Sequence, residues 1–192
     1  MVEDKKVINA WTLYDWANSV YPLVITTAIF PLYYKSVVGN NALVFGYIFD
    51  SVEIYSYAIA LSLLVVSFLS PLLSGIADFI GNKKVFMKSF NYVGATSCVG
   101  LFLWKELPIE LGLLFCVTAN IGFWGSLVFY NAYLPEIAHP KNHDLISAKG
   151  FSRGYFGSAI LLVFCLFSIM VLDWSPKYSF LFAGIWWIGF AQ

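Results

Sequence analysis

Six stretches of the chain are apolar over a length close to that needed to cross a lipid bilayer, and this feature limits the fold more than any other. A bilayer core requires about 20 mostly apolar residues per helix. Charged residues make up only 11% of the chain, against roughly 25% in a soluble domain, which is too few to cover a surface facing water. The sequence therefore predicts an all-α, polytopic membrane helix bundle. The six expected transmembrane helices lie at about residues 9–34, 53–79, 85–104, 109–133, 145–172 and 178–192.

The six helices are expected to form one domain over residues 1–192. Residues 1–104 and 107–192 each hold three of them, the pattern of two inverted three-helix repeats. The chain is still apolar at Gln192, and the 15 residues of the sixth stretch would span only about 22 Å. We expect a chain truncated in its sixth helix, or a fragment of a longer gene; the alternative is a complete six-helix protein with a ragged end.

Basic residues separate into two groups when the connections between the expected helices are assigned alternately to the two membrane faces. One face receives eight of them and the other three. Because cytoplasmic loops carry an excess of Lys and Arg, the N-terminus is predicted to be cytoplasmic. The first group is Lys5, Lys6, Lys83, Lys84, Lys88, Lys141, Lys149 and Arg153, and the second is Lys35, Lys105 and Lys177. The first apolar stretch contains Asp15 and Asn18 and no cleavage site, so we interpret it as an uncleaved helix.

Several other function classes lack support. Lys and Arg equal Asp and Glu at 11 each, and no basic patch suggests nucleic-acid binding. Cys98, Cys116 and Cys165 lie in apolar stretches, as small buried hydrophobic residues do. His139 and His143 lack any metal-ligand spacing and are typical of a solvated loop. Because no catalytic motif is present either, we predict no enzyme activity, no metal and no cofactor.

The first helix carries a polar stripe. At 100° per residue, five polar or helix-bending residues fall on one face of this helix. Asn18 borders that face, and Tyr14 directly precedes Asp15 in the sequence. A lipid-facing helix would not place an acid there, so the stripe faces protein or water. Asp15 is either a substrate or ion site, or a structural acid that caps a neighbouring helix or pairs with a basic residue, and the sequence does not separate the two. The stripe is Thr12, Asp15, Ser19, Pro22 and Thr26.

The fourth helix has a second stripe, with Tyr130 and Tyr133 close by. It could form a cavity wall of amides and aromatic rings, or it could make interhelical hydrogen bonds worth on the order of 1 kcal/mol each. We favour the hydrogen-bonding role for Asn120 and the functional role for Asn131, which precedes Pro135 and Glu136. The stripe is Asn120, Trp124, Leu127 and Asn131.

The turn between the second and third helices resembles the loop motif of the major facilitator superfamily, G-x-x-x-D-R/K-x-G-R/K-R/K. The matching residues are Asp78, Gly81, Lys83 and Lys84. Ser74 stands in place of the first glycine and Phe79 in place of a basic residue, so the ion pair of that basic residue is missing.

Further segments are similar to the vacuole-effluxer-like branch of that superfamily. They are residues 14–19 (YDWANS), Thr26, Phe30 and Pro31 in the first helix, residues 130–137 (YNAYLPEI) and 147–152 (SAKGFS), and Trp186 and Trp187 in the sixth. The resemblance covers almost the whole chain and implies the N-terminal half of a twelve-helix transporter. It further implies alternating access between two six-helix halves and amino acids as substrates, in relatives of the autophagy-related amino-acid effluxer.

The function that we predict is secondary active transport of small solutes, such as amino-acid efflux, in the cell membrane. The partners would be a small-molecule substrate, protons as coupling ions, the lipid bilayer, and a C-terminal half or a second chain. The alternative is a membrane-embedded assembly protein without transport activity. The predicted substrate and ion pathway is Tyr14, Asp15, Asn18, Ser19, Thr26, Asn120, Trp124 and Asn131.

A cytoplasmic gate is predicted at the ends of the second, fourth and fifth helices. We hypothesise that Asp78 and Glu136 meet Arg153 and Lys84 there and latch this side in the outward-facing state. The alternative is a set of interfacial charges that extend toward water independently. The gate residues are Asp78, Gly81, Lys83, Lys84, Glu136 and Arg153.

Overall fold

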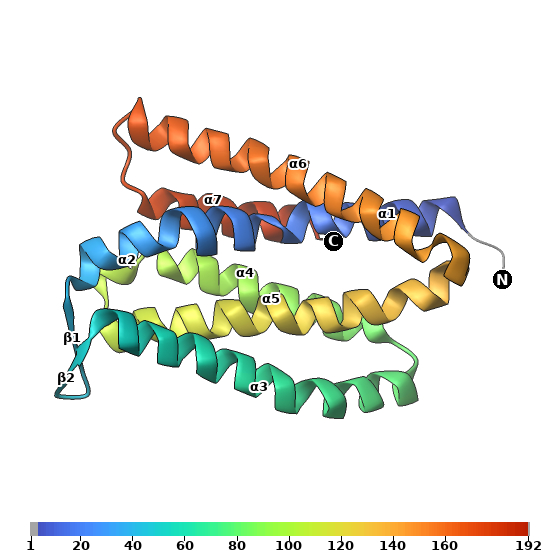
Figure 1. Cartoon of the computed structure of the whole chain (residues 1–192), viewed down its shortest axis with the longest axis horizontal. Coiled ribbons are helices and arrows are strands. Elements are labelled where there is room, and N and C mark those ends of the chain that lie inside the picture. Colours follow the sequence, from blue (N-terminus) through green and yellow to red (C-terminus); the bar gives the residue numbers. More distant parts are fainter. Residues whose placement is uncertain (1–3, 192) are drawn as a thin grey trace.

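The computed structural model describes residues 4–191, and its helices lie side by side along one long axis (Figure 1). Residues 1–3 and Gln192, with the ends of the expected N-terminal segment and sixth helix, lie outside the described residues. The long helices are α3 (Ser51–Ile80), α4 (Lys83–Leu101), α5 (Ile109–Ile137), α6 (His143–Met170) and α7 (Lys177–Phe190). Short 3-10 turns, η2 (Trp104–Glu106) and η3 (Pro140–Asn142), precede α5 and α6.

The first expected helix consists of three segments, α1 (Lys5–Asn18), η1 (Tyr21–Ile29) and α2 (Phe30–Val38). Asp4 caps α1, because its carboxylate accepts a hydrogen bond from the Lys6 backbone N–H at 2.8 Å. The segment η1 is a π-helix that begins beside Pro22. Because a π-helix pairs residues five apart, it turns the side chains that follow away from the stripe expected of an α-helix.

A small hairpin, absent from the predicted all-α fold, joins α2 to α3. Strand β1 (Asn41–Val44) pairs antiparallel with β2 (Tyr47–Asp50). Phe45 and Gly46 form the turn, both with positive φ, and the Phe45 N–H donates to Glu110 Oε1 of α5 at 2.9 Å. Asp50 ends the hairpin and caps α3, since its carboxylate accepts from the N–H groups of Val52 and Glu53.

The ends of the helices fall into two sets (Figure 1). The described N-terminus and the α3–α4 and α5–α6 connections lie at one end of the molecule, called here the basic end. The hairpin and the α4–α5 and α6–α7 connections lie at the other. This arrangement brings together the connections that carry the larger group of basic residues.

Three helical stretches of the described chain are long and apolar enough to cross a bilayer: Ser51–Ile80, Ile109–Ile137 and Pro140–Met170. The first expected span is divided by the π-helix, α4 begins with two lysines, and the described part of α7 has 14 residues. The structure thus has a helical bundle with one small hairpin and three clear candidate spans, and the count of six spans remains a prediction.

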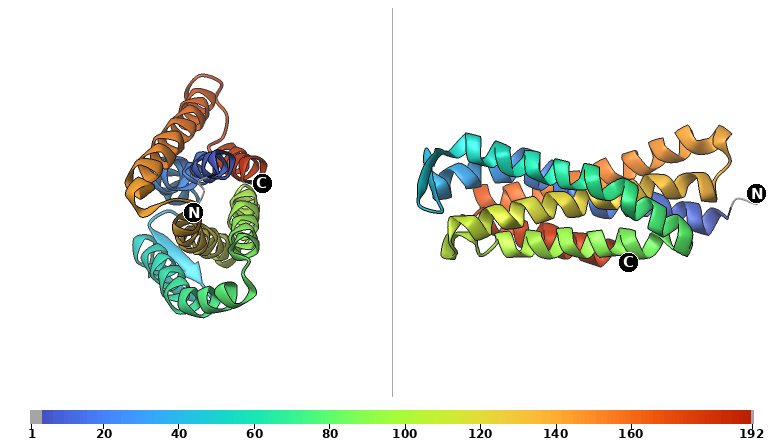
Figure 2. Two further views of the ribbon diagram at one scale, coloured as in Figure 1. Left: turned by 90° about the vertical axis from the view of Figure 1, so that its right-hand side faces the viewer. Right: turned by 90° about the horizontal axis from the view of Figure 1, so that it is seen from below.

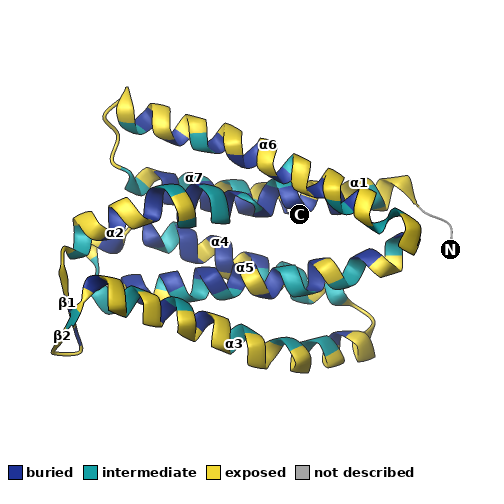
Figure 3. Cartoon of the chain, viewed as in Figure 1, coloured by how far each residue is buried: buried dark blue, intermediate teal, exposed yellow. Residues whose placement is uncertain are grey.

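Glycines allow the central helices to approach closely. A Cβ on Gly122 of α5 would overlap the backbone of Gly94 in α4, and Gly94 also faces the indole of Trp187 in α7. Viewed along the long axis, α3 and α6 lie at the periphery (Figure 2). Much of α3 and α6 is exposed, whereas residues of η1, α5 and α7 form the buried centre (Figure 3). Exposed apolar helices of this length suit a lipid environment.

Candidate functional site

A cavity of about 300 Å³ opens between α1, η1, α5 and α6, and we call it the Asp15 cavity. The polar lining residues come mainly from α1 and η1, and aromatic rings of α5 and α6 form the rest of the wall. The π-helix contributes to the wall, which accords with the frequent occurrence of π-turns at functional sites. The lining residues are Asp15, Asn18, Ser19, Pro22, Leu23, Thr27, Phe123, Leu127, Phe151, Tyr155 and Ser158.

Asp15 is only 3% exposed and makes one side-chain hydrogen bond to another helix. Its Oδ2 accepts the Tyr130 hydroxyl of α5 at 2.9 Å. No Lys, Arg or His of the described chain lies within ion-pair distance of this carboxylate. A buried acid with one donor and no basic partner retains the capacity to bind a proton or a cation.

Helix α6 packs on α1 through glycines at the level of Asp15. A Cβ on Gly150 would lie 2.7 Å from Asp15 Oδ2 and 3.0 Å from the Tyr130 hydroxyl. One on Gly154 would lie 3.0 Å from the Asp15 carbonyl oxygen and would overlap Ser19 Oγ. The absence of side chains at both positions lets α6 lie directly against the polar face of α1.

Asn18 lines the same cavity and is 1% exposed. Within residues 4–191, its Oδ1 atom has no hydrogen-bond partner. An unpaired buried carbonyl costs roughly 1–3 kcal/mol, so its presence favours a state in which a donor reaches it.

A second cavity, of about 220 Å³, lies near the basic end, and we call it the vestibule. It shares no lining residue with the Asp15 cavity. Tyr14 and Tyr130 line the vestibule. Tyr14 precedes Asp15 in the sequence, and Tyr130 donates a hydrogen bond to the Asp15 carboxylate. The lining residues are Val7, Ala10, Trp11, Tyr14, Lys83, Lys84, Met87, Phe129, Tyr130, Tyr133, Phe190 and Ala191.

The predicted pathway residues are divided by the structure. Asp15, Asn18 and Ser19 line the Asp15 cavity. Tyr14 faces the vestibule, where its hydroxyl donates to Asn91 Oδ1 of α4 at 3.0 Å.

Five residues of the two predicted stripes do not line the Asp15 cavity: Thr12, Thr26, Asn120, Trp124 and Asn131. Thr26 is turned by the π-helix into a separate cleft of about 10 Å³ and donates to the Tyr21 carbonyl at 3.4 Å. Thr12 is buried and accepts a hydrogen bond from Arg153. Trp124 and Asn131 are exposed.

Asn120 joins α5 to α3. Its side-chain N–H donates to Ser62 Oγ at 2.5 Å, and both residues are buried. The geometry is that of an interhelical hydrogen bond, the role that we favoured for this residue.

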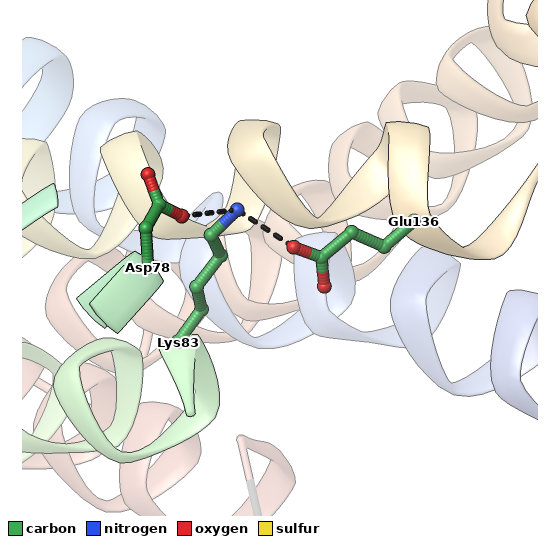
Figure 4. Close-up of polar contacts among 3 residues, drawn as sticks. All are labelled: Asp78, Lys83 and Glu136. Atoms are coloured by element: carbon green, nitrogen blue, oxygen red, sulfur yellow. Dashed lines mark hydrogen bonds and ion pairs between the residues drawn. The ribbon is translucent and has the colours of Figure 1, made fainter. Parts of the chain in front are cut away.

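The predicted gate residues Asp78, Lys83 and Glu136 form one cluster at the basic end (Figure 4). The Lys83 ammonium lies 2.8 Å from Asp78 Oδ1 and 2.6 Å from Glu136 Oε1, and so connects the end of α3 to the end of α5. Lys83 precedes the expected span 85–104, and hydrogen bonding to Asp78 and then to Glu136 raises its pKa above the usual 10.5. Gly81 ends α3 with a φ of 71°, the left-handed conformation that favours glycine.

The partners in this cluster differ from those hypothesised. Lys83, and not Lys84 or Arg153, bridges the two acids, while Lys84 lines the vestibule. Arg153 donates to Thr12 Oγ1 at 2.5 Å and to the Asn9 carbonyl at 3.2 Å. Because α6 packs against α1, Arg153 reaches the first turns of α1 instead of the end of α3.

Sequence reasoning missed Trp11, placed Tyr130 only near the fourth-helix stripe, and gave Gly150 only a helix-packing role, without its contact with Asp15. Trp11 stacks on Tyr130 at 4.1 Å with 8° between the rings, and its indole N–H donates to the Tyr130 carbonyl at 2.9 Å. A signal for Gly150 was its spacing of four from Gly154, which indicates close helix packing. Nothing in the sequence shows that the glycine faces Asp15.

These features define a helical membrane bundle with a buried acid at a cavity of mixed polar and apolar lining, the kind of site found in solute carriers. The family model described as vacuole effluxer Atg22 like matches residues 3–192, and the chain belongs to this family.

The chain is also similar to two curated proteins. The chain is 36% identical over 188 residues to the uncharacterized MFS-type transporter YxiO of Bacillus subtilis (strain 168), covering 93% of this chain and 43% of the relative. It is 28% identical over 155 residues to an uncharacterized protein of Aquifex aeolicus (strain VF5), covering 81% of this chain and 37% of the relative. The chain thus spans less than half the length of both. No solved structure matches the chain at a significant level.

Proposed function

We propose that this chain is the N-terminal six-helix half of a secondary active transporter of small solutes, with the Asp15 cavity as its share of the solute site. The observation that carries the proposal is Asp15 itself. It is a buried acid without a basic partner in the described chain, at a cavity lined by an amide and aromatic rings. Intramembrane acids in such cavities bind ions or charged substrates.

The proposed substrate class is amino acids, which the resemblance to vacuole effluxers implies. An α-ammonium group would pair with Asp15, and the exposed rings of Phe151 and Tyr155 would contact a cation or an apolar side chain. Protons are the proposed coupling ions, because a carboxylate that exchanges a proton for an ammonium group links the two. The opposing cavity wall would come from a further segment of the protein or from a second chain.

The proposed orientation places the basic end in the cytoplasm of the cell. It rests on the eight basic residues in the elements and connections gathered at that end (Figure 1). The cluster of Asp78, Lys83 and Glu136 would then act as a latch that closes the cytoplasmic side, because its ion pairs connect α3 to α5.

Amino-acid counterflow in proteoliposomes tests the proposal, with the longest chain that the gene encodes. Asp15→Asn should abolish the flux while the protein stays folded, since the amide cannot carry a negative charge. Asp173→Asn is the matched control, because Asp173 is an exposed acid outside both cavities. Flux that persists in Asp15→Asn would remove Asp15 from the pathway. A folded wild-type protein that moves no amino acid would exclude this substrate class and favour the assembly role.

A further inference from the structure

Tyr130 holds the Asp15 carboxylate from a position that three other contacts fix. Its hydroxyl donates to Asp15 Oδ2 at 2.9 Å. Its ring is stacked on Trp11 at 4.1 Å and on Tyr14 at 4.9 Å, and its carbonyl oxygen accepts the Trp11 indole N–H at 2.9 Å. Tyr130 is 2% exposed. A hydroxyl on a ring held in this way has little freedom to leave its acceptor.

Gly150 provides the space in which this hydrogen bond forms. A Cβ there would lie 2.7 Å from Asp15 Oδ2 and 3.0 Å from the Tyr130 hydroxyl, both closer than ordinary contact. Any side chain at this position would have to displace the carboxylate, the hydroxyl or the whole of α6. The small residue therefore does more than allow helix packing, since it faces the two atoms of one hydrogen bond.

The titratable and charged groups around Asp15 come from three elements. Tyr14 lies on α1 itself and bonds to Asn91, and Tyr130 comes from α5. From α6, Tyr155 lines the same cavity, and Arg153 is bound to Thr12 one turn before Asp15. Of these groups, Tyr130 is the one whose hydrogen bond reaches the carboxylate.

We propose that Tyr130 and Gly150 are positioning residues for Asp15: they fix the orientation in which its carboxylate faces the cavity, and the Tyr130 hydroxyl bonds better to the charged than to the protonated form. A proton or an ammonium group that arrives at Asp15 competes with the Tyr130 hydroxyl for the same carboxylate. The inference rests on the proposed function, because a fixed orientation matters only if a solute or ion binds there.

A chemical test needs no transport. A hydrophobic carbodiimide reacts with protonated carboxyl groups inside membranes, and mass spectrometry identifies the labelled residue. The full chain encoded by the gene is reconstituted in vesicles and labelled at neutral pH. Hydrogen bonds to a charged acceptor favour the charged form, and losing one changes the protonated fraction by about tenfold. Tyr130→Phe should therefore increase the rate of Asp15 labelling by about tenfold.

Tyr14→Phe is the matched control, because it removes a buried hydroxyl from the same aromatic stack whose partner is Asn91. Its labelling rate should equal that of the wild type. Gly150→Ala should also increase the rate of Asp15 labelling. This variant is informative only if the protein still folds, whereas Tyr130→Phe removes a single oxygen atom and is the primary test.

Equal rates in the wild type and Tyr130→Phe would overturn the proposal, as would an equal increase in Tyr130→Phe and Tyr14→Phe, which would indicate a general effect on packing. The labelling result is separate from the flux result. A protein that moves no solute and still shows the selective increase retains this positioning but loses its proposed function in transport.

Discussion

Replacing Lys83 by Met should weaken the connection between α3 and α5 at the basic end. The substitution keeps most of the apolar side chain and removes the charge that lies 2.8 Å from Asp78 and 2.6 Å from Glu136. The Lys83 side chain is 17% exposed, but those of the two acids are 61% and 48% exposed, so solvent screens both pairs. Exposed ion pairs contribute about 0.2–1 kcal/mol each, and we expect a total loss of about 1 kcal/mol in the free energy of unfolding.

Reversible unfolding in mixed detergent micelles measures this loss. The raised pKa of Lys83 sets the pH dependence. A group whose pKa is higher in the folded than in the unfolded state stabilises the folded state. This contribution is complete at a pH below the unfolded-state pKa, here 10.5, and is lost as the pH rises through the folded-state pKa. The difference in stability between the wild type and the Lys83→Met variant should therefore be constant from neutral pH to about pH 10 and should vanish above that range. It should also shrink at about 1 M salt, where the Debye length is about 3 Å.

Lys84→Met is the matched control for this experiment. Lys84 is adjacent and basic, and it has no carboxylate within ion-pair distance in residues 4–191. Equal losses in Lys83→Met and Lys84→Met would refute the reasoning, since net charge and not the specific bridge would then explain them. The proposed latch adds a second readout. Lys83→Met, and not Lys84→Met, should increase the reaction of a cysteine introduced at Ser19 with an impermeant thiol reagent applied from the basic end.

Two further variants test helix contacts in the same unfolding assay. Gly122→Ala should destabilise the protein by about 2 kcal/mol or more, because its Cβ would overlap the Gly94 backbone, whereas Gly75→Ala, with open space around it, should be neutral or stabilising. Similar values for the two glycines would contradict the close α4–α5 approach. Asn120→Ala should cost about 1 kcal/mol through loss of the Ser62 hydrogen bond, and Asn131→Ala, at an exposed position, should change stability by less than about 0.5 kcal/mol. A larger loss for Asn131 than for Asn120 would reverse the roles derived from their contacts.

The apolar length of the segments was sufficient to predict a helical membrane bundle, because in lipid a helix satisfies its own backbone. The family could also be recognised from the sequence, through short motifs such as residues 14–19 and the turn at Gly81. The hairpin could not be predicted from the sequence. Its strands are four residues each, and the polar contact that ties its turn to the bundle is with Glu110, which is 65 positions away in the chain.

The partners of the candidate site were harder to predict than its residues. A stripe calculated at 100° per residue assumes an α-helix, and the π-helix from Tyr21 to Ile29 rotates Thr26 out of the Asp15 cavity and brings Thr27 into it. The gate residues shared one membrane level in the predicted topology, but membrane level does not determine lateral neighbours. Arg153 lies against α1, and it is Lys83 that makes the bridge expected of Arg153 and Lys84.

The adjacent residues Tyr14 and Asp15 line two different cavities, the vestibule and the Asp15 cavity. Successive residues of an α-helix point about 100° apart, and accordingly Tyr14 lines the vestibule while its neighbour Asp15 lines the Asp15 cavity. The Tyr130 hydroxyl crosses this boundary, since its ring lines the vestibule while its oxygen atom bonds to Asp15. The Asp15 carboxylate is therefore bonded directly to a residue of the vestibule wall. Lys83, which bridges α3 and α5, also lines the vestibule, so Tyr130 and the ion pairs at the basic end adjoin the same cavity.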